Sequence, residues 1–163
     1  MTTMTESVRN GIDTSVLFAT LDAIKQQPEL GRFQFRARNV WLGGAHNRSS
    51  FKEFYGAGQE DTSRVQALTI DAGEPAVLLG TDTGPNPAEA LLHALAACLT
   101  TALVYVASAR KVKLTRVTFK IEGDAPPEKL RELVQRAQQR SAVFDMVTHG
   151  VPVAVDALVD GAA

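Results

Sequence analysis

The charge-free run Leu91–Ala109 constrains the fold of this chain more than any other feature. Pro87 stands shortly before it, and proline is tolerated in the first turn of a helix because its missing N–H would be unbonded there anyway. Asn86 is a good N-cap for such a start. The pattern predicts a long helix over about residues 87–110. A helix that is apolar on all sides lies in a protein core or in a bilayer.

The core is the interpretation that the sequence favours. The run has nearly the length of a membrane span, but it is rich in Ala, Thr and Ser and contains His93, so its free energy of insertion would be weak. We expect a buried helix and no membrane partner. The segment Met1–Gly11 is polar and lacks the apolar centre of a signal peptide, which predicts a cytoplasmic protein.

Composition narrows the class of protein further. The 163 residues fit one domain, and 45% hydrophobic with 21% charged residues is typical of a globular protein. Seventeen Lys and Arg against 18 Asp and Glu argue against nucleic acid as a partner. The single cysteine excludes an intrachain disulfide and a Cys-rich zinc site. The histidines, His46, His93 and His149, show no metal-ligand spacing, and we expect neither a metal nor a cofactor.

Hydrophobic periodicity predicts an α+β fold, because strands come first and are followed by helix, strand, helix and strand. We expect an N-terminal tail and helix over 1–30 and a second unit over 31–163. Within the first unit, residues 1–12 form a loose tail and Asp13 caps a helix that ends near Pro28. The remaining predicted elements are strands at 33–42, 51–55, 65–70, 117–121 and 151–159 and a helix that begins at 126–128.

Cys98 lies near the middle of the long helix, where it is either an inert core residue or a reactive thiol. None of its neighbours at helical spacing is a base. An ordinary thiol has a pKa of about 8.5, and apolar burial raises it. Reactivity therefore requires a cation from elsewhere. The candidates on the predicted strands are Arg36, Arg38 and Arg48. Composition alone favours the inert thiol, because free cysteine is among the most buried residue types.

A catalytic cluster within the helix itself is excluded by geometry. Glu89 precedes Cys98 by roughly 13 Å along the helix axis, and the two side chains leave opposite faces. His93 stands about 140° around the helix from Cys98. We expect His93 to be a core or interface residue.

Two segments of the chain resemble motifs of the OsmC/Ohr family, the osmotically inducible and organic hydroperoxide resistance proteins. Asn86–Leu99, NPAEALLHALAACL, resembles the central-helix motif of that family. Arg140–Asp145, RSAVFD, resembles its second motif, and the strand expected from Val151 onward also fits. The resemblance spans about residues 33–159.

The resemblance implies a fold, an assembly and a reaction. Members of the family are intertwined homodimers in which antiparallel sheets surround two long central helices. They reduce organic hydroperoxides: one cysteine becomes a sulfenic acid, and a second cysteine condenses with it to form a disulfide. An arginine held by a glutamate lowers the pKa of the first thiol in the family.

The correspondence with the family assigns roles to four residues here. Cys98 matches the peroxidatic position, Glu89 the acidic position and Arg48 the arginine, from the same or the other subunit. Ser141 stands where the family has its resolving cysteine, and a serine hydroxyl cannot form a disulfide. We therefore expect Cys98 and Ser141 to lie close together, with the Ser141 hydroxyl bonded to nearby backbone.

Loss of the resolving cysteine excludes a two-cysteine cycle within the chain. The resemblance then favours an OsmC-like thiol protein that reduces an organic hydroperoxide at Cys98, with an external thiol as reductant. Two alternatives stay open: a non-enzymatic protein that binds a small apolar ligand, and a structural remnant of the family. The chain also differs from the family between its two later helices, where Lys113–Glu122 has room for only one of the usual two strands.

Overall fold

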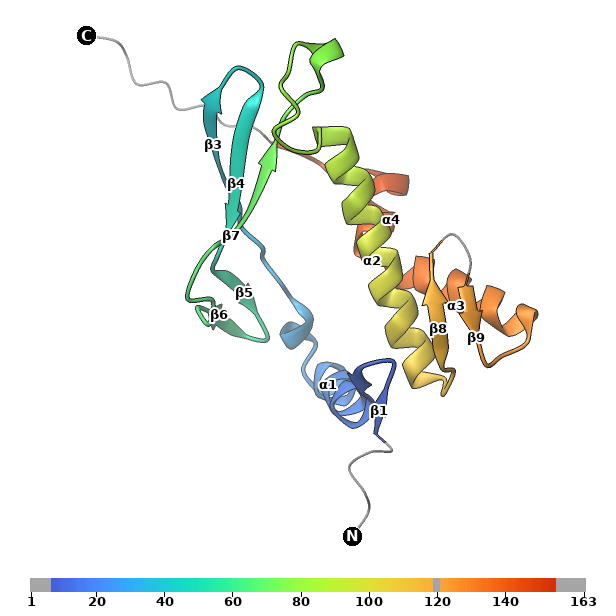
Figure 1. Ribbon diagram of the computed structural model, residues 1–163. Coiled ribbons are helices and arrows are strands. Elements are labelled where there is room, and N and C mark those ends of the chain that lie inside the picture. The colour runs from blue at the N-terminus through green and yellow to red at the C-terminus, as the bar shows by residue number, and fades with distance from the viewer. Residues whose placement is uncertain (1–6, 119–120, 155–163) are drawn as a thin grey trace.

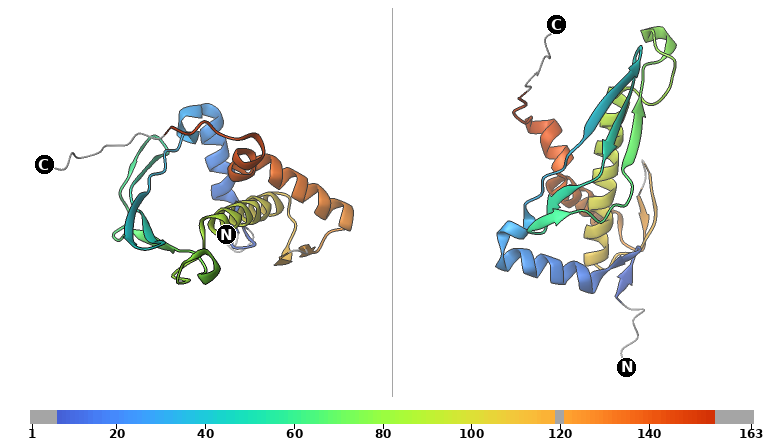
Figure 2. Two further views of the ribbon diagram at one scale, coloured as in Figure 1. Left: turned by 90° about the horizontal axis from the view of Figure 1, so that it is seen from above. Right: turned by 90° about the vertical axis from the view of Figure 1, so that its left-hand side faces the viewer.

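The computed structural model describes residues 7–118 and 121–154 of the chain. In this part of the chain, four α-helices combine with four small antiparallel sheets, so the fold belongs to the predicted α+β class. Strand-containing layers lie on both sides of the long helix α2, Pro87–Ala109 (Figure 1). The sheet of β3, β4 and β7 lies on one side of α2, and α3 and the hairpin β8–β9 on the other (Figures 1 and 2).

The N-terminal segment is more ordered than the sequence predicts. The helix α1, Thr14–Gln26, forms as expected, with the Asp13 carboxylate accepting hydrogen bonds from the N–H groups of Ser15 and Val16. The predicted loose tail is wrong over residues 7–12, which belong to a hairpin of β1 (Val8–Arg9) and β2 (Ile12–Asp13). Residues 1–6 lie outside the described part. After α1 comes a short 3-10 turn, Pro28–Gly31.

The first large sheet has the order β3-β4-β7; β3 and β7 start later than predicted, and β4 starts earlier. Residues 33–37 alternate in polarity but form only an isolated bridge from Gln34 to Tyr55, because the β3–β4 ladder begins at Arg38 opposite Ser50. The predicted strand at 51–55 divides between β4 and β5, which pairs with β6 in a separate hairpin. The bounds are β3 Arg38–Gly43, β4 His46–Phe51, β5 Phe54–Gly56, β6 Gln59–Asp61 and β7 Leu68–Ala72.

The helix α2 begins with the cap that the sequence predicts. The Asn86 side chain accepts a hydrogen bond from the N–H of Glu89, and the Glu89 carboxylate accepts one from the N–H of Asn86. This reciprocal capping box satisfies two N–H groups that a helix start leaves unbonded. A loop with a 3-10 turn, Ala76–Leu78, precedes it.

The segment between α2 and the next helix holds two short strands, which corrects the single strand predicted at 117–121. β8 (Leu114–Val117) pairs with β9 (Ile121–Gly123) in a hairpin, so the chain has both of the strands usual in the family, although Lys113–Glu122 was expected to have room for only one. Two helices follow, α3 (Pro127–Arg140) and α4 (Ala142–His149). Residues 151–154 form no strand, and the rest of the strand predicted to end at 159 lies outside the described residues.

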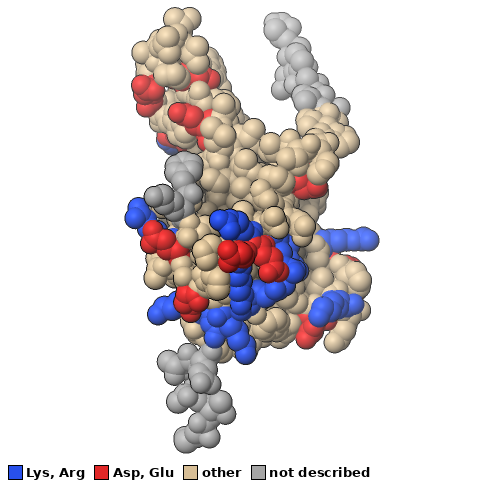
Figure 3. Space-filling model, turned by 90° about the vertical axis from the view of Figure 1, so that its right-hand side faces the viewer, with Lys and Arg blue, Asp and Glu red and all other residues tan. Residues whose placement is uncertain are grey.

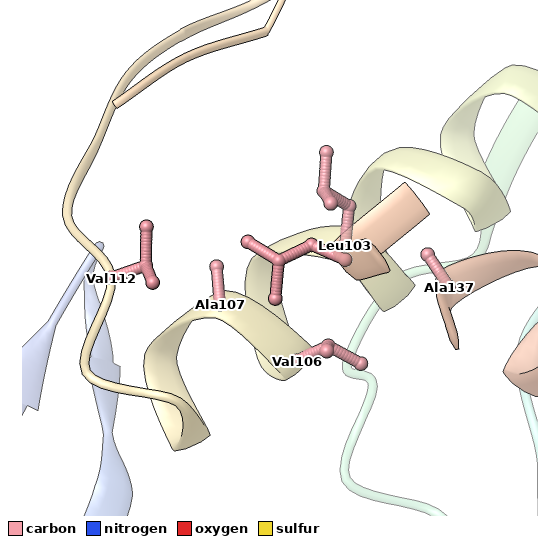
Figure 4. Packing of buried hydrophobic residues seen from close by; sticks show 6 residues of the cluster. Leu103, Val106, Ala107, Val112 and Ala137 are labelled. Carbon is pink, nitrogen blue, oxygen red and sulfur yellow. The ribbon is translucent and has the colours of Figure 1, made fainter. Parts of the chain in front are cut away.

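The hydrophobic core lies around the C-terminal half of α2. Leu103, Val106 and Ala107 of α2 pack with α3 on one side and the loop after α2 on the other (Figure 4). The other buried members of this cluster are Val112, Leu133 and Ala137. The C-terminal half of α2 is therefore the buried helix that the sequence predicts.

The N-terminal half of α2 is not buried within one chain, which corrects the expectation for the whole helix. Leu91 and Leu92 are 54% and 65% exposed. By length and composition α2 could cross a membrane, and only 17% of its most apolar window is buried. Lys and Arg side chains gather on the middle and lower part of the face that carries α3, whereas the upper part is largely free of them (Figure 3).

Candidate functional site

The structure brings Cys98 and Ser141 together from different helices. The Ser141 hydroxyl donates a hydrogen bond to the Cys98 sulfur, with 3.1 Å between oxygen and sulfur. Cys98 lies near the middle of α2 and is half-buried, whereas Ser141 is only 2% exposed. This is the proximity that the family resemblance leads us to expect.

Ser141 is held in place by the junction of two helices. It follows α3 directly and is the N-cap of α4, where its hydroxyl oxygen accepts a hydrogen bond from the N–H of Phe144 at 3.1 Å. Serine is a preferred N-cap because its short side chain reaches this N–H. The sharp change of direction between α3 and α4 thus aims the hydroxyl at α2.

An apolar cleft of about 410 Å³ lies along the same face of α2 as Cys98. Its floor includes Ala102, Tyr105 and Ala109, which follow Cys98 at the spacing of one helix face. The side chains of α1 that form its wall are Leu17, Phe18 and Leu21. The cleft therefore begins at Ala102, one helical turn after Cys98, and Cys98 is not among the residues that line it.

Arginines line the rim of this cleft, and one carboxylate partly balances them. Glu132 lies 2.7 Å from Arg136 and 3.5 Å from Arg110. The hydrogen bond from Arg136 is the main cause that lowers the pKa of Glu132 below its ordinary value. No carboxylate in the described part of the chain forms an ion pair with Arg140, which also lines the cleft. The rim thus keeps an excess of positive charge.

Arg48 lies away from Cys98 in the single chain. It projects from β4, where a bidentate pair joins its guanidinium to Asp71 on β7, with 2.8 Å between Nη2 and Oδ2. The hydrogen bond from Arg48 lowers the pKa of Asp71 to about 2, and His46, 3.5 Å from the same carboxylate, adds a smaller effect in the same direction. Figures 1 and 2 show this sheet standing apart from α2.

Glu89 serves the helix cap and does not approach Cys98. Its carboxylate lies 2.9 Å from the N–H of Asn86, and within the described residues it forms no ion pair with an arginine. The structure therefore joins only two of the four residues named from the family, Cys98 and Ser141.

Sequence reasoning missed the partners that fix these positions. Asp71 pairs with Arg48 because the two residues are opposite each other in the β4–β7 register. The alternation of apolar and polar residues within a single strand does not reveal how that strand is aligned with its neighbour. The bond from the Phe144 N–H to the Ser141 hydroxyl, in contrast, agrees with the expectation that this hydroxyl bonds to nearby backbone.

Comparison with known proteins finds a family model and several solved structures that match the chain. The family model described as OsmC-like protein matches residues 80–128, which contain Cys98, and confirms the resemblance seen in Asn86–Leu99. No curated protein sequence matches the chain significantly. A solved structure of an organic hydroperoxide resistance protein OsmC from Legionella pneumophila, titled a predicted redox protein and regulator of sulfide bond formation, is similar. It has 18% identity and a TM-score of 0.48 over 72% of this chain and 90% of that one.

Proposed function

We propose that this chain, an OsmC-like protein, reduces organic hydroperoxides by a one-cysteine cycle at Cys98. The observation that carries the proposal is the placement of a half-buried cysteine, inside the segment matched by the family, beside a hydroxyl donor and one helical turn before an apolar cleft that begins at Ala102 on the same face of α2. An apolar cleft one helical turn from a thiol suits a substrate that joins a hydrocarbon part to a peroxide group.

The cycle balances without a second cysteine in the chain. The Cys98 thiol first gives up its proton, and the thiolate attacks the terminal hydroxyl oxygen of the peroxide. The S–O bond forms as the O–O bond breaks, and the alkoxide takes up the proton released by the thiol and leaves as the alcohol. An external thiol then attacks the sulfenic acid, which releases water and leaves a mixed disulfide. A second external thiol reduces that disulfide and restores Cys98. A supply of thiol reductant fits the reducing cytoplasm.

The site is completed, in this proposal, by a second copy of the chain in an intertwined homodimer. Apolar side chains are exposed on α2 and on the sheet, among them Phe35 at 71% and Trp41 at 73%. Exposed apolar surface of this kind marks an interface. The partner copy would bring an arginine, with Arg48 as the candidate, toward Cys98. A folded monomer at micromolar concentration in light scattering would contradict the assembly.

The activity is tested by stopped-flow consumption of tert-butyl hydroperoxide with dithiothreitol as the external thiol. The wild type should turn over repeatedly with dithiothreitol and consume one equivalent without it. The Cys98→Ser variant should consume none above the rate of dithiothreitol alone. Equal rates for the two proteins would remove the peroxidase function.

The cleft also favours a second candidate function, the binding of a small apolar ligand without chemistry. Its apolar walls exist whether or not Cys98 reacts. Calorimetry with a medium-chain alcohol would detect such binding, and Leu21→Glu, which places a carboxylate among the cleft side chains, should weaken it at least about tenfold. Binding that is unaffected by this variant would exclude the cleft.

A further inference from the structure

The Ser141 hydroxyl has both of its hydrogen-bonding functions engaged. Its oxygen accepts from the N–H of Phe144, and its proton points to the sulfur of Cys98, each at 3.1 Å. A hydroxyl has one proton to donate and two lone pairs with which to accept. Because the backbone N–H can only donate, the single proton of Ser141 is left for the sulfur. The side chain is 2% exposed, so water does not compete strongly for that proton.

We infer that Ser141 is a catalytic hydrogen-bond donor that holds Cys98 in its reactive thiolate form. A hydrogen bond to an ionised acceptor is stronger than one to the neutral group, so the contact favours the thiolate over the thiol. The amide bond from Phe144 polarises the hydroxyl and strengthens its donation. The consequence for peroxide reduction rests on the function proposed above, whereas the effect on thiol ionisation does not.

The same contact gives the oxidised state a different fate from that in a two-cysteine protein. After Cys98 has gained an oxygen from the peroxide, the residue beside it can donate a hydrogen bond but cannot form an S–S bond. At the position where the family has its resolving cysteine, which condenses with the sulfenic acid, this chain has Ser141, which can only form a hydrogen bond. The sulfenic acid therefore persists until an external thiol attacks it.

The test compares the rates at which iodoacetamide alkylates Cys98 near neutral pH and at about pH 10, where an ordinary thiol is ionised without help. In Ser141→Ala the rate near neutral pH should fall by about tenfold, because a hydrogen bond to a charged group is lost. At about pH 10 the rate should equal or exceed that of the wild type, since an unbonded thiolate is the stronger nucleophile. Ser141→Thr, which keeps a hydroxyl, should restore the wild-type profile.

A matched control separates the hydroxyl from its role as a helix cap. Ala142→Gly weakens the first turn of α4 at an exposed position and leaves Ser141 intact, so its alkylation profile should match the wild type. An equal loss of rate at both pH values in Ser141→Ala, or the same loss in Ala142→Gly, would show that only packing had changed. Either result would overturn the inference.

A second variant tests the placement of the two side chains without depending on ionisation. Ser141→Cys, treated with a mild oxidant, should lose both free sulfhydryls as an intrachain disulfide forms with Cys98. Two free sulfhydryls that persist in the folded variant would contradict the contact. Alkylation uses no peroxide, so a pH-dependent loss in Ser141→Ala together with no peroxide consumption by the wild type would refute the proposed function and leave this inference standing.

Discussion

The two halves of α2 lie in contrasting environments within one chain. In the C-terminal half, Leu103 and Ala107 are 4% and 0% exposed and pack against α3 and the loop after α2. In the N-terminal half, Leu92 is 65% exposed although this part of the helix is also rich in Leu and Ala. Cys98 lies where the two halves meet. One chain thus builds a core for half of its central helix and leaves the other half without cover.

The contrast separates a part of the chain that is packed on its own from a part that keeps apolar surface in water. The buried half stabilises α2, α3 and the hairpin β8–β9 as a unit, because apolar area removed from water supplies the main free energy of folding. The exposed half and the sheet of β3, β4 and β7 keep apolar surface in water, which favours association. The predictions below test the two halves separately.

The largest change in the free energy of unfolding is expected from a cavity beside the buried C-terminal half of α2. Leu133 of α3 is 1% exposed and packs on α2, so Leu133→Ala should lower the free energy of unfolding by about 2–5 kcal/mol in urea denaturation. Val65→Ala, at a position 90% exposed, is the matched control and should change it by less than about 0.5 kcal/mol. Similar losses for the two variants would contradict the division into a buried and an exposed part.

The hairpin β1–β2 should contribute the next largest effect, because it fastens the N-terminus to the buried half. The Asn10 amide donates to the Ser108 hydroxyl at 3.1 Å and to the Val112 carbonyl at 3.0 Å, and its oxygen accepts from the N–H of Leu114 at 2.9 Å. Asn10→Ala should lower the free energy of unfolding by about 2 kcal/mol, since it removes three hydrogen bonds and leaves the Val112 carbonyl and the Leu114 N–H without this partner, although Ser108 keeps its bond to the Arg9 carbonyl.

Asn10 also has a positive φ of 50°, which adds a backbone cost to the alanine variant. Asn10→Gly serves as the control because glycine adopts that φ without strain. Glycine should recover only the backbone part of the loss. Full recovery by glycine would show that the three side-chain hydrogen bonds contribute little.

Much of this fold could be predicted from the sequence where a pattern is local. Asn86 and Pro87 correctly located the start of α2, and Asp13 that of α1. The sequence could not show that half of α2 lacks cover, because periodicity reports which residues are apolar and not what covers them. The β8–β9 hairpin was missed because its two strands are only four and three residues long, too short for a clear alternation.

The candidate site shows the same division between local and distant contacts. The family motif led to Cys98 and Ser141, which the structure joins although they stand 43 residues apart. Arg48 was chosen as the counterpart of the family's arginine, and its pairing with Asp71 depends on a strand register that the sequence does not display. A register is set by packing between distant segments, so reasoning along single elements cannot supply it.

Association should show a smaller effect, confined to the exposed half. If a second chain covers Leu92, then Leu92→Asp places a charge in an apolar interface and should weaken the dimer at least tenfold, or about 1.4 kcal/mol. Sedimentation at several protein concentrations measures this change. Leu133→Ala should leave the association of the folded chains unchanged. A Leu92→Asp protein that associates like the wild type would place the interface elsewhere.

The smallest change in stability is expected from the Arg48–Asp71 ion pair on the sheet. The direction of its pH dependence follows from the pKa of Asp71. Arg48 lowers that pKa from the ordinary 3.8 to about 2, so the folded protein releases this proton more readily than the unfolded chain. The pair therefore stabilises the fold above about pH 4, and the contribution is lost as the pH falls toward about 2. In Arg48→Met the stability should fall less over this interval than in the wild type.

The salt dependence of ion pairs can distinguish surface that a second copy covers from surface that stays in water. The Arg48 and Asp71 side chains are 50% and 30% exposed in one chain, where screening by salt should nearly abolish the difference between Arg48→Met and the wild type. The pair Arg36–Glu60, with side chains 45% and 52% exposed, provides the control through Arg36→Met. If a second copy covers Arg48, the salt dependence of its pair should be weaker than that of the control at protein concentrations where the dimer forms. Equal salt dependence of the two pairs under those conditions would show that Arg48 remains in water, and would remove it as the arginine that completes the Cys98 site.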